Sequence, residues 1–163
     1  KGYSLAGYRC GYVVVSKDVN EMYQQMRKVQ DTIPICPSRI SQYAAMGALQ
    51  AGRSWVLNNV ATLKAGREAI LSAVSPLEQI MGGSGAMYIM AKLPKGNNDD
   101  QAFARILVKT YGVAVIPGTF CGFPGWIRVC YSNLPPGKCI EAASRLRQGI
   151  LEQFGSNSSQ CKS

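Results

Sequence analysis

The sequence contains no histidine, and none of its six cysteines forms a CxxC pair. Because the common zinc sites of proteins are built from histidine and paired cysteine, the composition argues against such a site, and we expect no metal. Long apolar runs are also missing, and none reaches the roughly 18 residues that a membrane-spanning helix requires. We therefore expect a soluble chain with no membrane partner.

Acidic residues are scarce, with 9 against 18 basic residues, which gives a formal net charge of +9. A strongly basic chain suggests nucleic acid as a partner. The basic residues, however, stand singly along segments of helical character, and no run of five or more occurs. They also lack the interleaved aromatic residues typical of RNA-binding segments. We interpret them as solvated helix faces and expect no nucleic-acid partner.

The cysteines are scattered along the chain, at Cys10, Cys36, Cys121, Cys130, Cys139 and Cys161. Reduced thiols in a cytosol-like compartment fit this pattern, so we expect a cytoplasmic location. The alternative is a secreted disulfide framework, but such frameworks usually occur in shorter chains with denser cysteines.

The 163 residues are enough for a domain with a real core, and 47% hydrophobic against 17% charged residues is a globular composition. The first residue is lysine, not methionine, and a patterned, apolar-rich segment follows at once. We interpret the chain as a piece of a longer protein.

Apolar periodicity and turn residues predict a mixed α/β layout. Short β-branched or aromatic runs predict strands at 11–15, 87–93, 113–116 and 126–131. Helical spacing, with capping and stop residues, predicts helices at 16–32, 38–52, 54–74, 99–111 and 135–154. The last three strands, with helices on one side, suggest a small layered domain, whereas the first strand has no strand neighbour nearby in sequence. The tail, 155–163, is expected to be disordered.

The opening segment, KGYSLAGYRCGY, carries Lys1 and, eight residues later, Arg9. A lysine amine condenses reversibly with an aldehyde and, once released, can carry a proton. An arginine fork binds phosphate oxygens bidentately, and the flanking Gly7 and Gly11 would let the backbone approach a phosphate closely. Alternatively, Lys1 is a terminal charge and Arg9 is a surface residue ahead of a strand. The residues alone leave both interpretations open.

The predicted strand WIRVCYS contains a third basic residue, Arg128. The alternation of side chains along a strand puts Arg128 on one face with Trp126 and Cys130, within a run otherwise suited to burial. A buried guanidinium left unpaired would cost several kcal/mol. Arg128 should therefore meet either an acidic side chain or the carboxylate of a ligand.

These segments resemble the class I/II aminotransferases of fold type I, the aspartate aminotransferase superfamily, which depend on pyridoxal phosphate. The resemblance rests on the spacing of Lys1 and Arg9, on GxRxGY around Arg9, and on the stretch 112–132. Weaker matches at 41–45 and 83–89 extend it over nearly the whole chain. It implies that Lys1 is catalytic and holds the cofactor covalently, that Arg9 binds the cofactor phosphate, and that Arg128 binds the substrate α-carboxylate. General likeness is greatest to the plant enzymes that use aromatic amino acids and methionine.

The resemblance also implies an α/β fold class and a domain organisation. Residues 1–32 would end the large cofactor-binding domain, 33–76 would form a helical connection, 77–154 would form the small C-terminal α/β domain, and 155–163 the tail. The substrates would be an amino acid and a 2-oxo acid, and the full-length enzyme would be a homodimer. The family's other cofactor-binding residues precede the lysine, so we expect the fragment alone to be inactive.

Two alternatives remain open from the sequence. A pyridoxal-phosphate lyase or synthase of the same fold would retain Lys1, Arg9 and Arg128. A catalytically inactive, truncated module would instead bind partners through the surfaces that a missing domain once covered. In that case the run 13–15 would expose an apolar face.

Overall fold

The computed structural model describes residues 2–16 and 18–155, and the chain divides into two compact units, Lys1–Val60 and Ala61–Ser163. Each unit is described by itself. The second unit contains the hydrophobic core, whereas Ser41 is the only buried residue among the described residues of the first. Among the described residues, no helix is both long enough and apolar enough to cross a membrane.

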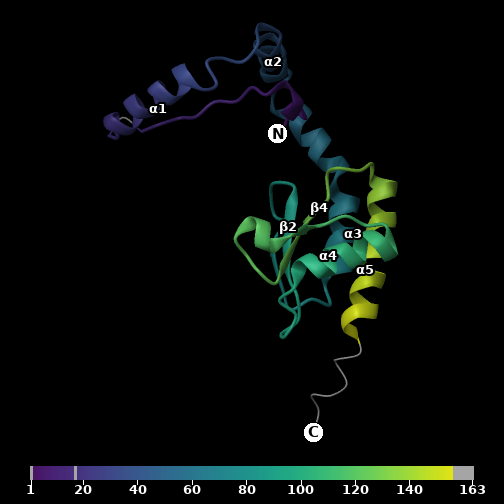
Figure 1. Cartoon of the computed structure of the whole chain (residues 1–163). Coiled ribbons are helices and arrows are strands. Elements are labelled where there is room, and N and C mark those ends of the chain that lie inside the picture. The colour runs from purple at the N-terminus through teal and green to yellow at the C-terminus, as the bar shows by residue number, and fades with distance from the viewer. Residues whose placement is uncertain (1, 17, 156–163) are drawn as a thin grey trace. The chain divides into compact units, whose positions relative to one another are not determined.

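The second unit is built on a four-stranded antiparallel sheet in the order β1-β2-β4-β3. Figure 1 shows β2 and β4 side by side within this unit. The strands are β1 (Gln79–Gly82), β2 (Tyr88–Lys92), β3 (Ile116–Pro117) and β4 (Trp126–Cys130). In the register of the two central strands, Tyr88 lies opposite Cys130 and Met90 lies opposite Arg128.

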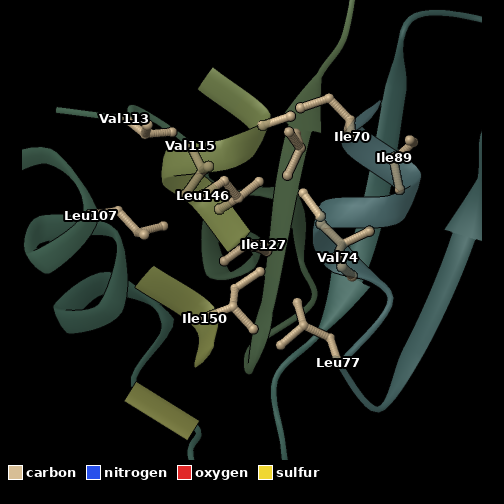
Figure 2. Close-up of a cluster of buried hydrophobic side chains, with 14 of the residues drawn as sticks. Ile70, Val74, Leu77, Ile89, Leu107, Val113, Val115, Ile127, Leu146 and Ile150 are labelled. Atoms are coloured by element: carbon tan, nitrogen blue, oxygen red, sulfur yellow. The ribbon is translucent and has the colours of Figure 1, made fainter. Parts of the chain in front are cut away.

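Three helices pack on one face of this sheet: α3 (Lys64–Val74), α4 (Asp100–Tyr111) and α5 (Pro136–Phe154). The face that they cover carries Ile89, Ala91, Ile127 and Val129, each at most 5% exposed. Figure 2 shows the apolar side chains that meet these strands from the helices, including Ile70, Val74, Leu107, Leu146 and Ile150. Burying such side chains is worth about 1.5–3 kcal/mol each, so this core holds the sheet and the helices together.

Helices α3 and α5 approach closely because a glycine faces a cysteine. A Cβ atom on Gly66 would lie 2.9 Å from the Cys139 sulfur, which is too close for any larger residue without a shift. Burial raises the pKa of the Cys139 thiol, because the apolar surroundings disfavour its thiolate. Cys139 therefore contributes to packing and not to thiolate chemistry.

The first unit contains a short 3₁₀ turn, Ala6–Tyr8, the helix α1 (Asn20–Thr32) and most of the helix α2 (Arg39–Thr62). The last two residues of α2 belong to the second unit. Gly52 interrupts α2 with non-helical backbone angles, φ 75° and ψ −176°. This break is where the sequence predicted one helix to stop and another to begin. Many large apolar side chains of the unit are exposed, among them Tyr12, Val13, Val14, Met22, Tyr23, Val29, Ile33 and Ile40.

Several predicted elements are corrected by the structure. Residues 11–15 form no strand, since no other described strand pairs with them, and Tyr12 is 86% exposed. Helix α1 begins at Asn20, because the hydroxyl of Ser16 donates to Asp18 and caps no helix. The predicted helix 54–74 is broken at Leu63, and the predicted strand 113–116 reaches its partner only at Ile116. Strand β1 was not predicted from the sequence.

The remaining predictions for the second unit are confirmed. β2, β4, α4 and α5 lie where periodicity placed them, within one or two residues. Asp99 caps α4 by accepting a hydrogen bond of 2.8 Å from the Ala102 amide, and Gly112 ends the helix in the left-handed conformation. The fold class is α/β. Most of the predicted disordered tail lies outside the described residues.

Candidate functional site

Arg128 lies in the middle of β4, on the face of the sheet that the helices do not cover. Ile127 and Val129 are buried toward the helices, whereas Trp126, Arg128 and Cys130 are only partly buried. This confirms the face that alternation along the strand predicted for Arg128. The residues directly opposite Arg128 on the neighbouring strands are apolar, Met90 on β2 and Ile116 on β3.

The guanidinium of Arg128 is held against an aromatic ring but has no anionic partner among the described residues. Its central carbon lies 4.6 Å from the centroid of the Tyr88 ring. Its Nε atom is buried without a hydrogen-bond partner, and no ion pair recorded in the described part of the chain includes Arg128. A buried N–H donor that stays unpaired is unusual and costs about 1–3 kcal/mol. The donors of a guanidinium edge suit a planar carboxylate.

The loop that leads into β4 is fixed by Asp100, whose side chain is 1% exposed. Its carboxylate accepts hydrogen bonds from the Thr119 amide at 3.0 Å, the Gly125 amide at 2.9 Å and the Thr119 hydroxyl at 2.9 Å. Immediately before Thr119, Gly118 packs so tightly that a Cβ atom would lie 2.3 Å from the carbonyl oxygen of Phe123. The backbone just before Trp126 therefore has little freedom, and this fixes the start of the strand that carries Arg128.

This bond network around Asp100 was not predicted from the sequence. Two adjacent aspartates at a predicted helix start were visible, and a single cap needs only one of them. The second carboxylate therefore indicated a further role for one of the two aspartates. Its partners lie 19 and 25 residues away, so the spacing of the sequence could not identify them.

We expect Asp100→Ala to lower the free energy of unfolding of the second unit by about 3 kcal/mol, because the buried Gly125 amide loses its charged acceptor. Asp99→Ala is the matched control and should cost about 1 kcal/mol, the usual value of a helix cap. Urea unfolding followed by circular dichroism measures both. Equal losses in the two variants would show that Asp100 is no more than a second cap.

Arg9 belongs to the first unit and lies at the end of the 3₁₀ turn in the left-handed conformation, with φ 53° and ψ 37°. Both its amide and one guanidinium nitrogen donate to the Ala6 carbonyl oxygen, at 3.3 and 3.0 Å. This arrangement is local, and the side chain as a whole is exposed.

A cavity of about 870 Å³ lies beside Arg9, lined also by Ser4, Gly7, Gly11, Ser38 and Ser41. The hydroxyls of Ser38 and Ser41 are hydrogen-bonded to each other at 2.8 Å. A guanidinium, hydroxyl groups and glycine backbone are the donor set that phosphate-binding sites use. The residues present therefore fit a phosphate group.

Lys1 lies outside the described residues. The first described residues are attached to α2 within the first unit: the ring of Tyr3 stacks on Trp55 with centroids 5.8 Å apart, and Gly2 is near Val56. Among the predicted site residues, Arg9 is thus described in the first unit and Arg128 in the second.

Comparison with known proteins gives one consistent result. The sequence profile described as aminotransferase class I and II matches residues 1–146. An aromatic aminotransferase of Arabidopsis thaliana is 41% identical over 154 residues, covering 93% of this chain and 39% of that protein. An aspartate aminotransferase of Thermotoga maritima is 27% identical and is covered over 33% of its length. The chain thus spans about a third to two fifths of the length of these relatives.

Solved structures agree with the sequence matches. The crystal structure of an aromatic aminotransferase from Pyrococcus horikoshii superposes with a TM-score of 0.76 and 26% identity, covering 95% of this chain and 42% of that one. The aspartate aminotransferase of Thermotoga maritima gives a TM-score of 0.72 with 26% identity, covering 91% and 37%. The similarity therefore extends through both units of the chain.

Proposed function

The chain belongs to the aminotransferase class I and II family, and from this membership we propose that the whole protein transfers an amino group from an amino acid to a 2-oxo acid with pyridoxal phosphate. Within this proposal, residues 1–32 end the cofactor-binding domain, 33–76 connect the domains, and 77–154 form the small domain. The chain spans 39% of its Arabidopsis relative, so the activity is proposed for the protein that contains it.

The observation that carries the proposal is the state of Arg128. Its Nε is buried and unpaired, and its guanidinium lies against an aromatic ring on the uncovered face of the sheet. An arginine that served only the fold would be expected to have an acidic partner, because an unpaired buried donor destabilises the folded chain. A ligand with a planar carboxylate would satisfy this donor, and every 2-amino acid and 2-oxo acid carries one.

The residues of the first unit supply the proposed cofactor contacts. Arg9 would pair with the phosphate, and the hydroxyls beside it would donate further hydrogen bonds. Lys1 would hold the cofactor through its amine and, when displaced by the substrate amine, would carry the proton from Cα. The bound cofactor supplies an electron-withdrawing ring that makes the Cα proton of the amino acid acidic.

The substrate, the assembly and the location of the whole protein are also part of the proposal. Likeness to the Arabidopsis aromatic aminotransferase favours an aromatic amino acid or methionine as the donor. We propose that the whole enzyme works as a cytoplasmic homodimer, with its basic residues solvated and neither nucleic acid nor membrane as a partner.

Product analysis of the whole protein tests the reaction class. With pyridoxal phosphate and tyrosine or methionine, we expect sustained 2-oxo acid formation only when an acceptor such as 2-oxoglutarate is present. A lyase or synthase would instead form product continuously without an acceptor, and that result would contradict the proposal. The 163-residue chain alone is the control. We expect it to be inactive, because its first unit buries almost no side chain of its own.

A further inference from the structure

We propose that Tyr88 is a positioning residue for Arg128: its ring contacts the guanidinium and restrains it, so that the N–H groups are oriented for the carboxylate of the ligand. This inference rests on the proposed role of Arg128 and deepens it. On this inference, Tyr88 on β2 controls how the ligand carboxylate is oriented, although the charge that binds it belongs to Arg128 on β4.

The sheet register brings the two side chains together. Tyr88 begins β2 and lies directly opposite Cys130, two positions along β4 from Arg128. Both residues lie on the uncovered face, so they are diagonal neighbours, a separation that an aromatic and a long side chain can bridge. The distance of 4.6 Å from the guanidinium carbon to the ring centroid lies well within the roughly 6 Å range of a cation–π contact.

Tyr88 is itself fixed by the turn that precedes it. The hydroxyl of Tyr131, a residue only 5% exposed, donates to the carbonyl oxygen of Ala86 at 2.8 Å and to that of Gly85 at 3.2 Å. The amide of Tyr131 also donates to the carbonyl oxygen of Met87 at 3.2 Å. These hydrogen bonds connect the turn before β2 to Tyr131 at the end of β4. They fix the position of the Tyr88 ring relative to the strand that carries Arg128.

A cation–π contact uses the charge of the guanidinium and none of its N–H groups as hydrogen-bond donors to an oxygen. The π face attracts the positive charge from one side, whereas carboxylate oxygens bind the edge of the fork. Arginine loses rotamer freedom when it binds a ligand, and a guanidinium that is already held against a ring loses less. Tyr88 should therefore strengthen the binding of carboxylates and leave the binding of neutral molecules unchanged.

Calorimetry with the whole protein tests this inference, using 3-phenylpropionate and its neutral analogue 3-phenylpropanamide as probes. We expect Tyr88→Leu to weaken binding of the acid by about tenfold and that of the amide by less than about twofold. Tyr88→Phe keeps the ring and should bind both probes within about twofold of the unchanged protein. Thermal unfolding midpoints verify that each variant is folded.

Tyr23→Leu is the matched control, because Tyr23 forms the other Tyr–Arg contact recorded in the described residues, 5.9 Å from Arg27 on α1. It should leave the affinity for both probes unchanged. In an Arg128→Leu background, Tyr88→Leu should have no further effect on the acid, which would assign the whole effect to this pair.

Two results would overturn the inference. Equal weakening of the acid and the amide by Tyr88→Leu would make Tyr88 a wall of the pocket, and equal effects of Tyr88→Phe and Tyr88→Leu would assign the role to the hydroxyl. Failure of the proposed function gives a different result. If Arg128→Leu leaves the preference for acid over amide intact, Arg128 does not bind the carboxylate, whatever Tyr88 does.

Discussion

Replacing Lys1 by alanine is expected to reduce amino-group transfer by the whole protein more than about 10⁴-fold. A positioned acid–base group contributes about 10²- to 10⁴-fold, and this substitution also removes the amine that we propose binds the cofactor covalently. No other common side chain offers both functions, because arginine stays protonated and the hydroxyl and thiol groups do not form the same link to an aldehyde.

Absorbance spectroscopy provides the second measurement for this variant. The visible or near-ultraviolet band of lysine-bound pyridoxal phosphate should be replaced by the band of the free aldehyde. Lys64→Ala, which removes an exposed lysine of α3, is the control and should retain both activity and band. Persistence of the original band in Lys1→Ala would show that another lysine holds the cofactor.

Replacing Arg128 by leucine is expected to lower kcat/KM for amino-group transfer by roughly 30- to 4,000-fold. Removing one partner of a desolvated, hydrogen-bonded charge pair costs about 2–5 kcal/mol, and a factor of ten corresponds to about 1.4 kcal/mol. Leucine keeps the apolar stem of the side chain but removes the charge and the donors. Cofactor binding should be intact, since the proposed phosphate contacts come from Arg9 and the residues that line the cavity beside it.

The controls for Arg128 separate charge from geometry. Arg128→Lys keeps the charge but not the planar fork and should lie between the leucine variant and the unchanged enzyme. Arg105→Leu removes an exposed arginine of α4 and should have little effect. Loss of the cofactor band in Arg128→Leu, instead of loss of substrate affinity, would assign Arg128 a structural role.

Local chemistry was sufficient to predict much of the second unit. The run around Ile127 alternates in burial as its sequence alternates, and α4 begins and ends at residues with known capping behaviour. These signals depend only on neighbours within a few positions. Strand β1 was missed because its four residues, QIMG, carry no alternation and end in glycine. It forms because β2 offers a complete edge for pairing.

In the first unit, local sequence was not sufficient to predict the secondary structure. The run around Val13 has the composition of a buried strand, yet a strand requires a neighbour to accept and donate its backbone hydrogen bonds. No described strand lies beside it, so Val14 is 84% exposed. Composition indicates what a segment is suited to, and pairing partners determine whether it forms.

The charged residues of the candidate site could be predicted from the sequence, but the residues that hold them in position could not. Arg9 and Arg128 could be singled out because a basic residue next to glycines, or inside an apolar strand, is unusual. Asp100 and Tyr88 could not, because their contacts join residues that only the folded sheet brings together. Lys1 stays a prediction from its chemistry and from the family.

The uneven burial of the two units sets the calorimetric behaviour of this chain. Heat capacity rises on unfolding because buried apolar surface becomes hydrated, by about 12–15 cal/mol/K for each residue of a well-packed protein. With the core of the described residues confined to 61–155, only about 95 residues contribute fully, which corresponds to about 1.1–1.4 kcal/mol/K. A chain of 163 residues packed throughout would give about 2.0–2.4 kcal/mol/K. The stability curve of this chain should accordingly be shallow, with a broad thermal transition.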